Sequence, residues 1–103
     1  MIHVIATVQL KSGKREAFLE HFHRVVPHVR AEQGCIEYGP TVGIPTDISA
    51  QAPIDEDVVV VVEKWESLEA LRAHLTAHHM RQYRESVADL VARPAVLQIL
   101  QSA

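Results

Sequence analysis

Alternating apolar and polar positions predict four β-strands in this chain. The first strand begins the sequence, where single residues separate the apolar positions Ile2, Val4, Ala6, Val8 and Leu10. A repeat of two residues is typical of a strand, because successive side chains point to opposite faces. Three more strands are expected: one that starts at Cys35 and ends near residues 39–43, one from Val58 to about Lys64, and one from Ala95 to Leu100. The third contains five valines in a row, so we expect burial on both of its faces.

A first helix is predicted between the first two strands. Its apolar side chains recur at helical spacing, at Phe18, Phe22, Val25, Val26 and Val29. Ser12 is expected to cap its start by accepting a backbone N–H bond. Gly34 is expected to end it in a left-handed conformation, and Pro27 predicts a kink before that end.

A second helical region is predicted after the valine strand, with Ser67 as its cap. Its apolar side is expected to contain Leu68, Leu71 and Leu75. Helical spacing continues to Val91, either in one helix or after a break near Ala77 and His78.

The order β-α-β-β-α-β predicts an α+β domain of the ferredoxin-like type, an antiparallel sheet with its helices on one face. We expect a single domain over residues 1–103. The other face of the sheet would expose valines, which favours a homodimer formed through that sheet face. Residues 44–57 form a long loop without a regular pattern.

Charge and cysteine content narrow the possible partners and location. The net charge is −3 and the basic residues are dispersed, so we expect neither nucleic acid nor a membrane surface as a partner. No apolar run is long enough to span a membrane, and no signal peptide is recognisable. Cys35 is the only cysteine, which fits a reducing compartment, so a cytoplasmic protein is expected.

The junction between the valine strand and the second helix predicts a pocket. Trp65 ends the strand, and the following helix carries His74, His78 and His79. Spacing alone would allow His74 and His78 to share a metal ion, but no third ligand is evident, so no metal site is expected.

Three segments resemble the antibiotic biosynthesis monooxygenase (ABM) domain family. They are the string from Glu63 to Leu71 followed by His74 and His79, the turn from Gly34 to Tyr38, and the opening strand with Lys11–Lys14. The resemblance implies a dimeric α+β barrel. For some members it implies oxygenation of a quinol or a polyketide-like phenol without metal or flavin. Members often carry Trp and His at the positions of Trp65, His74 and His79. They often have Pro-His-Phe where this chain has His78-His79-Met80.

These observations predict a cofactor-independent monooxygenase acting with O2 on a quinol or polycyclic phenol, a small aromatic substrate. A neutral histidine suits the removal of a phenolic proton. His79 is the first candidate because it flanks the apolar stripe and matches the family position, and His74 is the second. Trp65 and Tyr38 can stack on an aromatic ring and Thr7 can bond a substrate oxygen. Met80 and Tyr83 are further candidate substrate contacts.

Two other interpretations stay open. The first is a non-catalytic dimeric barrel that binds a small hydrophobic ligand or serves in stress response. The second is haem binding or degradation. Haem-degrading relatives use Asn on the first strand, whereas this chain has Thr7 in that region, which disfavours haem.

Overall fold

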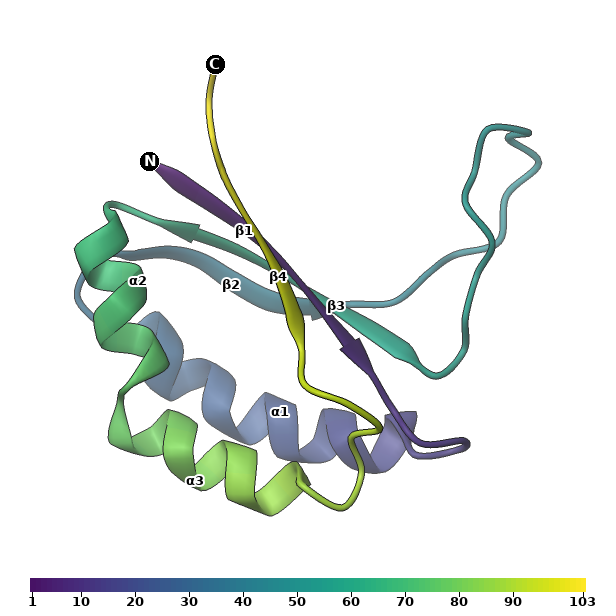
Figure 1. Ribbon diagram of the computed structural model, residues 1–103, viewed down its shortest axis with the longest axis horizontal. Helices are drawn as coiled ribbons and strands as arrows, with labels where there is room; N and C mark the ends of the chain where they lie inside the picture. The colour runs from purple at the N-terminus through teal and green to yellow at the C-terminus, as the bar shows by residue number, and fades with distance from the viewer.

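The computed structural model describes all residues from Met1 to Ala103, and its elements alternate as the sequence predicts (Figure 1). They are, in chain order, β1 (Ile2–Gln9), α1 (Arg15–Arg30), β2 (Cys35–Thr41), β3 (Val58–Trp65), α2 (Leu68–Leu75), α3 (His78–Val87) and β4 (Val96–Gln101). The second helical region is divided into α2 and α3. The predicted order β-α-β-β-α-β is therefore confirmed, with a break in its second helix.

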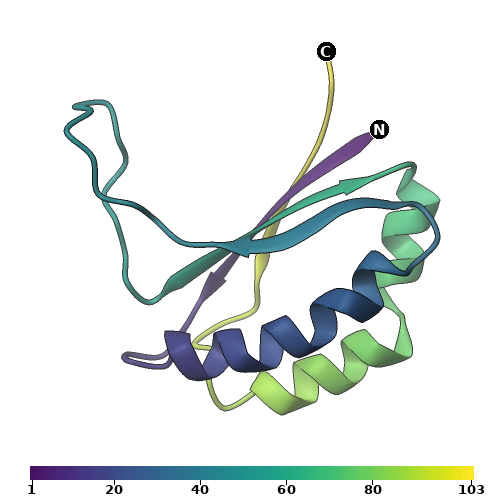
Figure 2. The same cartoon turned by 180° about the vertical axis from the view of Figure 1, so that it is seen from behind.

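The four strands form one antiparallel sheet in the order β2-β3-β1-β4. The two central strands pair along their whole lengths, from Ile2 opposite Trp65 to Gln9 opposite Val58. All three helices lie on the same side of the sheet, as Figures 1 and 2 show from opposite directions. The ferredoxin-like fold predicted from the element order is confirmed.

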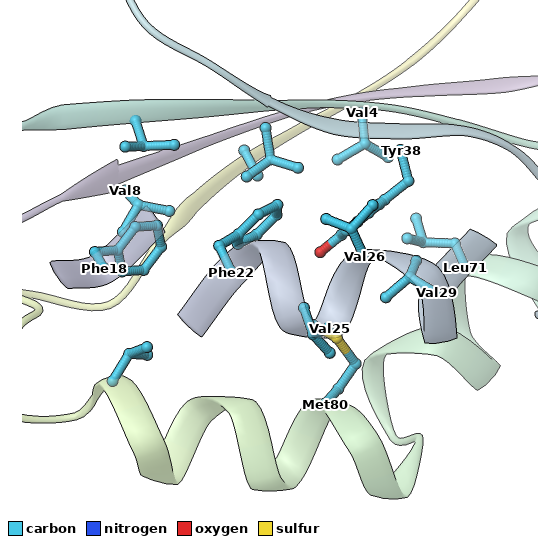
Figure 3. Packing of buried hydrophobic residues seen from close by; sticks show 14 of the residues in the cluster. Val4, Val8, Phe18, Phe22, Val25, Val26, Val29, Tyr38, Leu71 and Met80 are labelled. Atoms are coloured by element: carbon cyan, nitrogen blue, oxygen red, sulfur yellow. The ribbon is translucent and has the colours of Figure 1, made fainter. Parts of the chain in front are cut away.

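The core lies between the sheet and α1. Every second residue of the central strands points toward the helices, so Val4, Val8 and Val59 are almost inaccessible to solvent. They pack with the apolar side of α1, in particular Phe18 and Phe22. Figure 3 shows Val4, Val8, Phe18 and Phe22 in the space beneath the sheet. The helical spacing noted in the sequence thus marks the buried side of α1.

The first two helices, α1 and α2, differ in how their beginnings are capped. Ser67 caps α2 as predicted, because its Oγ accepts a hydrogen bond of 3.1 Å from the Ala70 N–H. Ser12 does not cap α1, whose N-cap position is Lys14 without a side-chain bond. A tight turn with Gly13 at φ 76° follows β1 and delays the helix. Ser12 is therefore too early in the chain to reach the first free N–H groups.

The break between α2 and α3 occurs at Ala77, whose backbone is extended (φ −63°, ψ 145°). The guanidinium of Arg84 donates a hydrogen bond of 2.6 Å to the Leu75 carbonyl, one of the free acceptors at the end of α2. Because α3 restarts after an extended residue, one helical wheel cannot describe both helices. Within α2 itself, His74 is buried, whereas Leu68, expected in the apolar stripe, is 43% exposed.

The side of the sheet opposite the helices is uncovered within one chain. Val58, Val60 and Val62 point to this side and are only half-buried, and every residue of β4 is exposed. We call this surface the open sheet face. The segment from Val42 to Asp57 extends away from the sheet between β2 and β3 (Figure 1).

Candidate functional site

An apolar cavity lies between the helix-facing side of the sheet, α3 and the segment that leads into β4. Its volume is about 540 Å³, and 14 of its 19 lining residues are hydrophobic. This size and character are typical of sites for small organic molecules, in which a few polar groups fix the ligand's orientation. The polar groups at this cavity include Glu63, His74, Tyr38 and Tyr83.

Glu63 is a buried carboxyl group in the wall of this cavity. Alternation along β3 puts it on the same side as Val61 and Trp65, facing the helices, and it is only 4% exposed. The indole Nε1–H of Trp65 donates a hydrogen bond of 2.9 Å to its Oε1. Burial raises the pKa of Glu63 to about 7, against the opposing effect of the Trp65 hydrogen bond. The group can therefore gain or lose a proton near neutral pH.

Sequence reasoning missed Glu63, although a signal was present. Trp65 is separated from it by one residue, so both side chains must lie on one face of the strand. The alternation that turns Trp65 toward the helices turns Glu63 the same way, and a buried carboxyl is a candidate for acid–base chemistry.

His74, at the end of α2, is the second ionisable group of the cavity wall. Its ring packs against Trp65 and Tyr38, with centroids 4.6 Å and 5.3 Å away. Burial lowers its pKa, partly offset by Glu32. The Nδ1 atom lies 2.9 Å from Glu32 Oε2, and because a carboxylate only accepts hydrogen bonds, Nδ1 carries the hydrogen. His74 is therefore neutral over a wider pH range than an ordinary histidine.

The other ring nitrogen of His74, Nε2, is free to act on a ligand. It forms no hydrogen bond within the protein, whereas every fully buried side-chain nitrogen or oxygen has a partner. Nε2 is therefore not fully buried, and His74 is one of the residues that line the cavity. With the hydrogen on Nδ1, Nε2 presents a lone pair.

A tight turn after α1 brings Glu32 to His74. Gly34 has φ 85°, and its carbonyl accepts a hydrogen bond of 2.9 Å from the Glu66 N–H at the end of β3. A Cβ on Gly34 would lie 2.6 Å from the Cβ of Ala70 in α2, so the turn and the helix approach as closely as glycine allows. Glu32 was also missed from the sequence, because its partner is 42 residues away.

His79, the first candidate for the base, does not line the cavity. Its Nε2 lies 2.7 Å from Glu32 Oε2, the oxygen that also bonds His74. Its ring stacks against His28 in an open groove between α1 and α3. His79 was expected to flank the apolar stripe, but the break at Ala77 turns it toward this groove instead. His78, the next residue before it, is exposed in the same groove.

The remaining predicted residues lie in three places: in the cavity wall, directly behind that wall, and on the open sheet face. Tyr38, Met80 and Tyr83 line the cavity, and burial raises the pKa of both tyrosines. Trp65 is fully buried behind Glu63 and His74. Thr7 is exposed on the open sheet face, so the structure does not bring it to the cavity.

Cys35 and the histidines do not form a metal-binding arrangement. Cys35 is half-buried, and burial raises the pKa of its thiol, which disfavours the reactive thiolate. The rings of His74 and His79 are already bonded to one oxygen of Glu32. No group of three His, Cys, Asp or Glu side chains in the chain is placed to hold an ion.

Fold and cavity together define a class of small ferredoxin-like α+β proteins with an apolar site and buried acid–base groups. The sequence model of the antibiotic biosynthesis monooxygenase family matches residues 1–86, and the chain belongs to this family. No helix has the length and apolar character needed to cross a membrane.

Comparison with individual proteins agrees with this assignment. The chain is 39% identical over 89 residues to Probable quinol monooxygenase YgiN of Escherichia coli K12, covering 84% of this chain and 85% of that protein. Among solved structures it is similar to Rv0793 of Mycobacterium tuberculosis, with a TM-score of 0.80, 25% identity and coverage of 99% and 94%. It is also similar to SO0527 of Shewanella oneidensis, with a TM-score of 0.77, 26% identity and coverage of 96% and 87%.

Proposed function

We propose that this protein is a monooxygenase that oxidises a quinol or a polycyclic phenol with O2, using no metal or flavin. The observation that carries the proposal is that His74 and Glu63, two ionisable side chains, both line one apolar cavity. Membership of the family and the likeness to a protein described as a quinol monooxygenase support the same reaction class.

In the proposed reaction His74 is the base. Its Nε2 accepts the proton of a substrate hydroxyl, which leaves a phenolate and an imidazolium. The phenolate then passes one electron to O2, giving a substrate radical and superoxide. The two combine at a ring carbon that carries a hydrogen, which forms the new C–O bond of a peroxide, and the imidazolium returns its proton to the outer peroxide oxygen. Loss of the hydrogen on that carbon as a proton then breaks the O–O bond, so that the carbon becomes a quinone carbonyl and the second oxygen atom leaves as water. An apolar wall suits this sequence because it keeps bulk water from the radical pair.

The other cavity residues are proposed to orient the substrate. Glu63, with its pKa of about 7, is available in its protonated form to donate a hydrogen bond to a second substrate oxygen. Tyr38, Tyr83 and Met80 offer apolar and aromatic surface to a flat ring. Trp65 supports the site from behind, through its hydrogen bond to Glu63.

We further propose that two copies pair through the open sheet face. The half-buried valines of β3 and the side chains of Val96 and Leu100 in β4 give this face an apolar patch that a second subunit can cover. Val96 and Leu100, which are 63% and 49% exposed, lie on this face opposite Thr7 and His3.

Oxygen consumption with menadiol and several polycyclic phenols tests the function. The protein should be free of metal, and autoxidation in buffer is subtracted. We expect protein-dependent uptake that falls about 10²-fold or more in His74→Ala, the usual contribution of a general base. His78→Ala is the matched control, because the His78 ring is exposed, forms no hydrogen bond to Glu32 and does not line the cavity. Absence of uptake with every substrate would favour the ligand-binding barrel.

A further inference from the structure

We propose that Glu32 is a positioning residue that fixes the tautomer of His74 and stabilises its protonated form, and that His79 holds Glu32 in place. This inference rests on the proposed function only for its kinetic consequence. The geometry itself consists of one carboxylate oxygen between two imidazole rings, 2.9 Å from His74 Nδ1 and 2.7 Å from His79 Nε2.

The role of Glu32 follows from what its carboxylate can and cannot do. It does not line the cavity, so it cannot contact a substrate there. A carboxylate accepts hydrogen bonds, and it therefore selects the form of His74 with hydrogen on Nδ1 and a lone pair on Nε2. When Nε2 takes a proton, the nearby negative charge stabilises the imidazolium. In serine hydrolase triads, too, a carboxylate orients a histidine and the histidine transfers the proton.

His79 explains why Glu32 stays in position. The Glu32 side chain is 13% exposed, and a carboxylate at this depth needs partners. His79 supplies the second hydrogen bond from α3, while its own ring is 26% exposed and stacks on His28. His79, one of the two histidines at family positions, thus acts on His74 through Glu32 and not in the cavity itself.

Several ionisable groups surround His74 and must be included in any pH argument. They come from the turn after α1, from β2, from β3 and from α3, and are Glu32, Tyr38, Glu63, His79 and Arg84. Glu32 opposes the effect of burial on the pKa of His74, whereas His79 and Arg84 add to it. Removing the charge of Glu32 should therefore lower the pKa of His74 further.

The test is Glu32→Gln, observed by ¹⁵N NMR of the histidine rings and by the pH dependence of oxygen uptake. In the wild type we expect His74 to carry its hydrogen on Nδ1. In Glu32→Gln the titration of His74 should move to lower pH, and kcat should fall about 10²-fold with little change in KM. Glu66→Gln is the matched control, because it removes a nearby carboxylate that bonds no histidine, and it should behave as the wild type.

The outcomes separate this inference from the proposed function. Hydrogen on Nε2 of His74 in the wild type would overturn the positioning role, whether or not Glu32→Gln folds. An active wild type whose Glu32→Gln variant keeps both kcat and the His74 titration would also overturn it. A wild type without oxygen uptake would refute the function alone, because the NMR measurement still decides the role of Glu32. His79→Ala should lower kcat only a few-fold, because the hydrogen bond between His74 and Glu32 remains.

Discussion

At the scale of single residues, the carboxyl of Glu63 makes the stability of the fold depend on pH. Its pKa is about 7 in the folded chain, compared with 4.5 for the free group. Between these values the folded state binds more protons at Glu63 than the unfolded state does. Stability is therefore lost as pH rises from about 4.5 to 7, and the whole cost is present above pH 7.

Glu63→Gln should remove this cost while leaving an acceptor for the Trp65 N–H. We expect the variant to be more stable than the wild type by up to about 3 kcal/mol at pH 8, and by much less at pH 4.5. Urea unfolding of both proteins at a fixed protein concentration over this pH range measures the difference. A difference that does not vary with pH would mean that Glu63 titrates normally.

Gly34 is the residue on which the approach of Glu32 to His74 depends. Gly34→Ala should lower the free energy of unfolding by more than the ~1–2 kcal/mol cost of a left-handed alanine, because its Cβ would also meet Ala70. Gly13→Ala is the matched control. Gly13 has a similar φ of 76° but no atom within 4 Å of the added Cβ, so it isolates the backbone cost. Equal losses in thermal denaturation would contradict the packing argument.

At the scale of elements, α2 is a short helix whose last turn holds His74. It has eight residues, too few to be stable alone, so its cap and its packing determine whether it forms. Ser67→Ala removes the bond to the Ala70 N–H and should cost about 1 kcal/mol. Ser49→Ala, in the exposed segment between β2 and β3, should cost almost nothing. Chemical unfolding compares them, and equal values would show that the cap contributes little.

The elements also show which parts of the fold can be predicted from the sequence. Strand alternation and the helical spacing of Phe18 and Phe22 depend on neighbours in the chain, so strands, α1 and their order were predicted correctly. The site depends on contacts between distant segments. Glu32 meets His74 only because the turn at Gly34 packs on α2, and the break at Ala77 redirects His79. Only Glu63 could have been predicted from local sequence, because alternation along the strand puts it on the same face as Trp65.

At the scale of the whole molecule, the open sheet face leaves apolar side chains of a single chain exposed to water. The central strand β3 has valines on both sides, but only those facing the helices are fully covered. A second subunit would remove the remaining apolar surface from water, which is the main driving force for stable association. The segment from Val42 to Asp57 adds further exposed apolar side chains, Ile44 and Ile48, that extend beyond the sheet.

Val60 lies near the middle of the open sheet face, where β3 pairs with Thr7 of β1 and Thr41 of β2. Val60→Asp should disrupt the proposed dimer, because burying an unpaired carboxylate costs at least about 3 kcal/mol, equivalent to about 10²-fold in the dissociation constant. Ala17→Asp introduces the same charge on the exposed surface of α1 and should leave association unchanged. Light scattering after size-exclusion chromatography gives the mass of each variant. A Val60→Asp protein that is still dimeric would place the interface elsewhere, and a monomeric wild type would remove the dimer altogether.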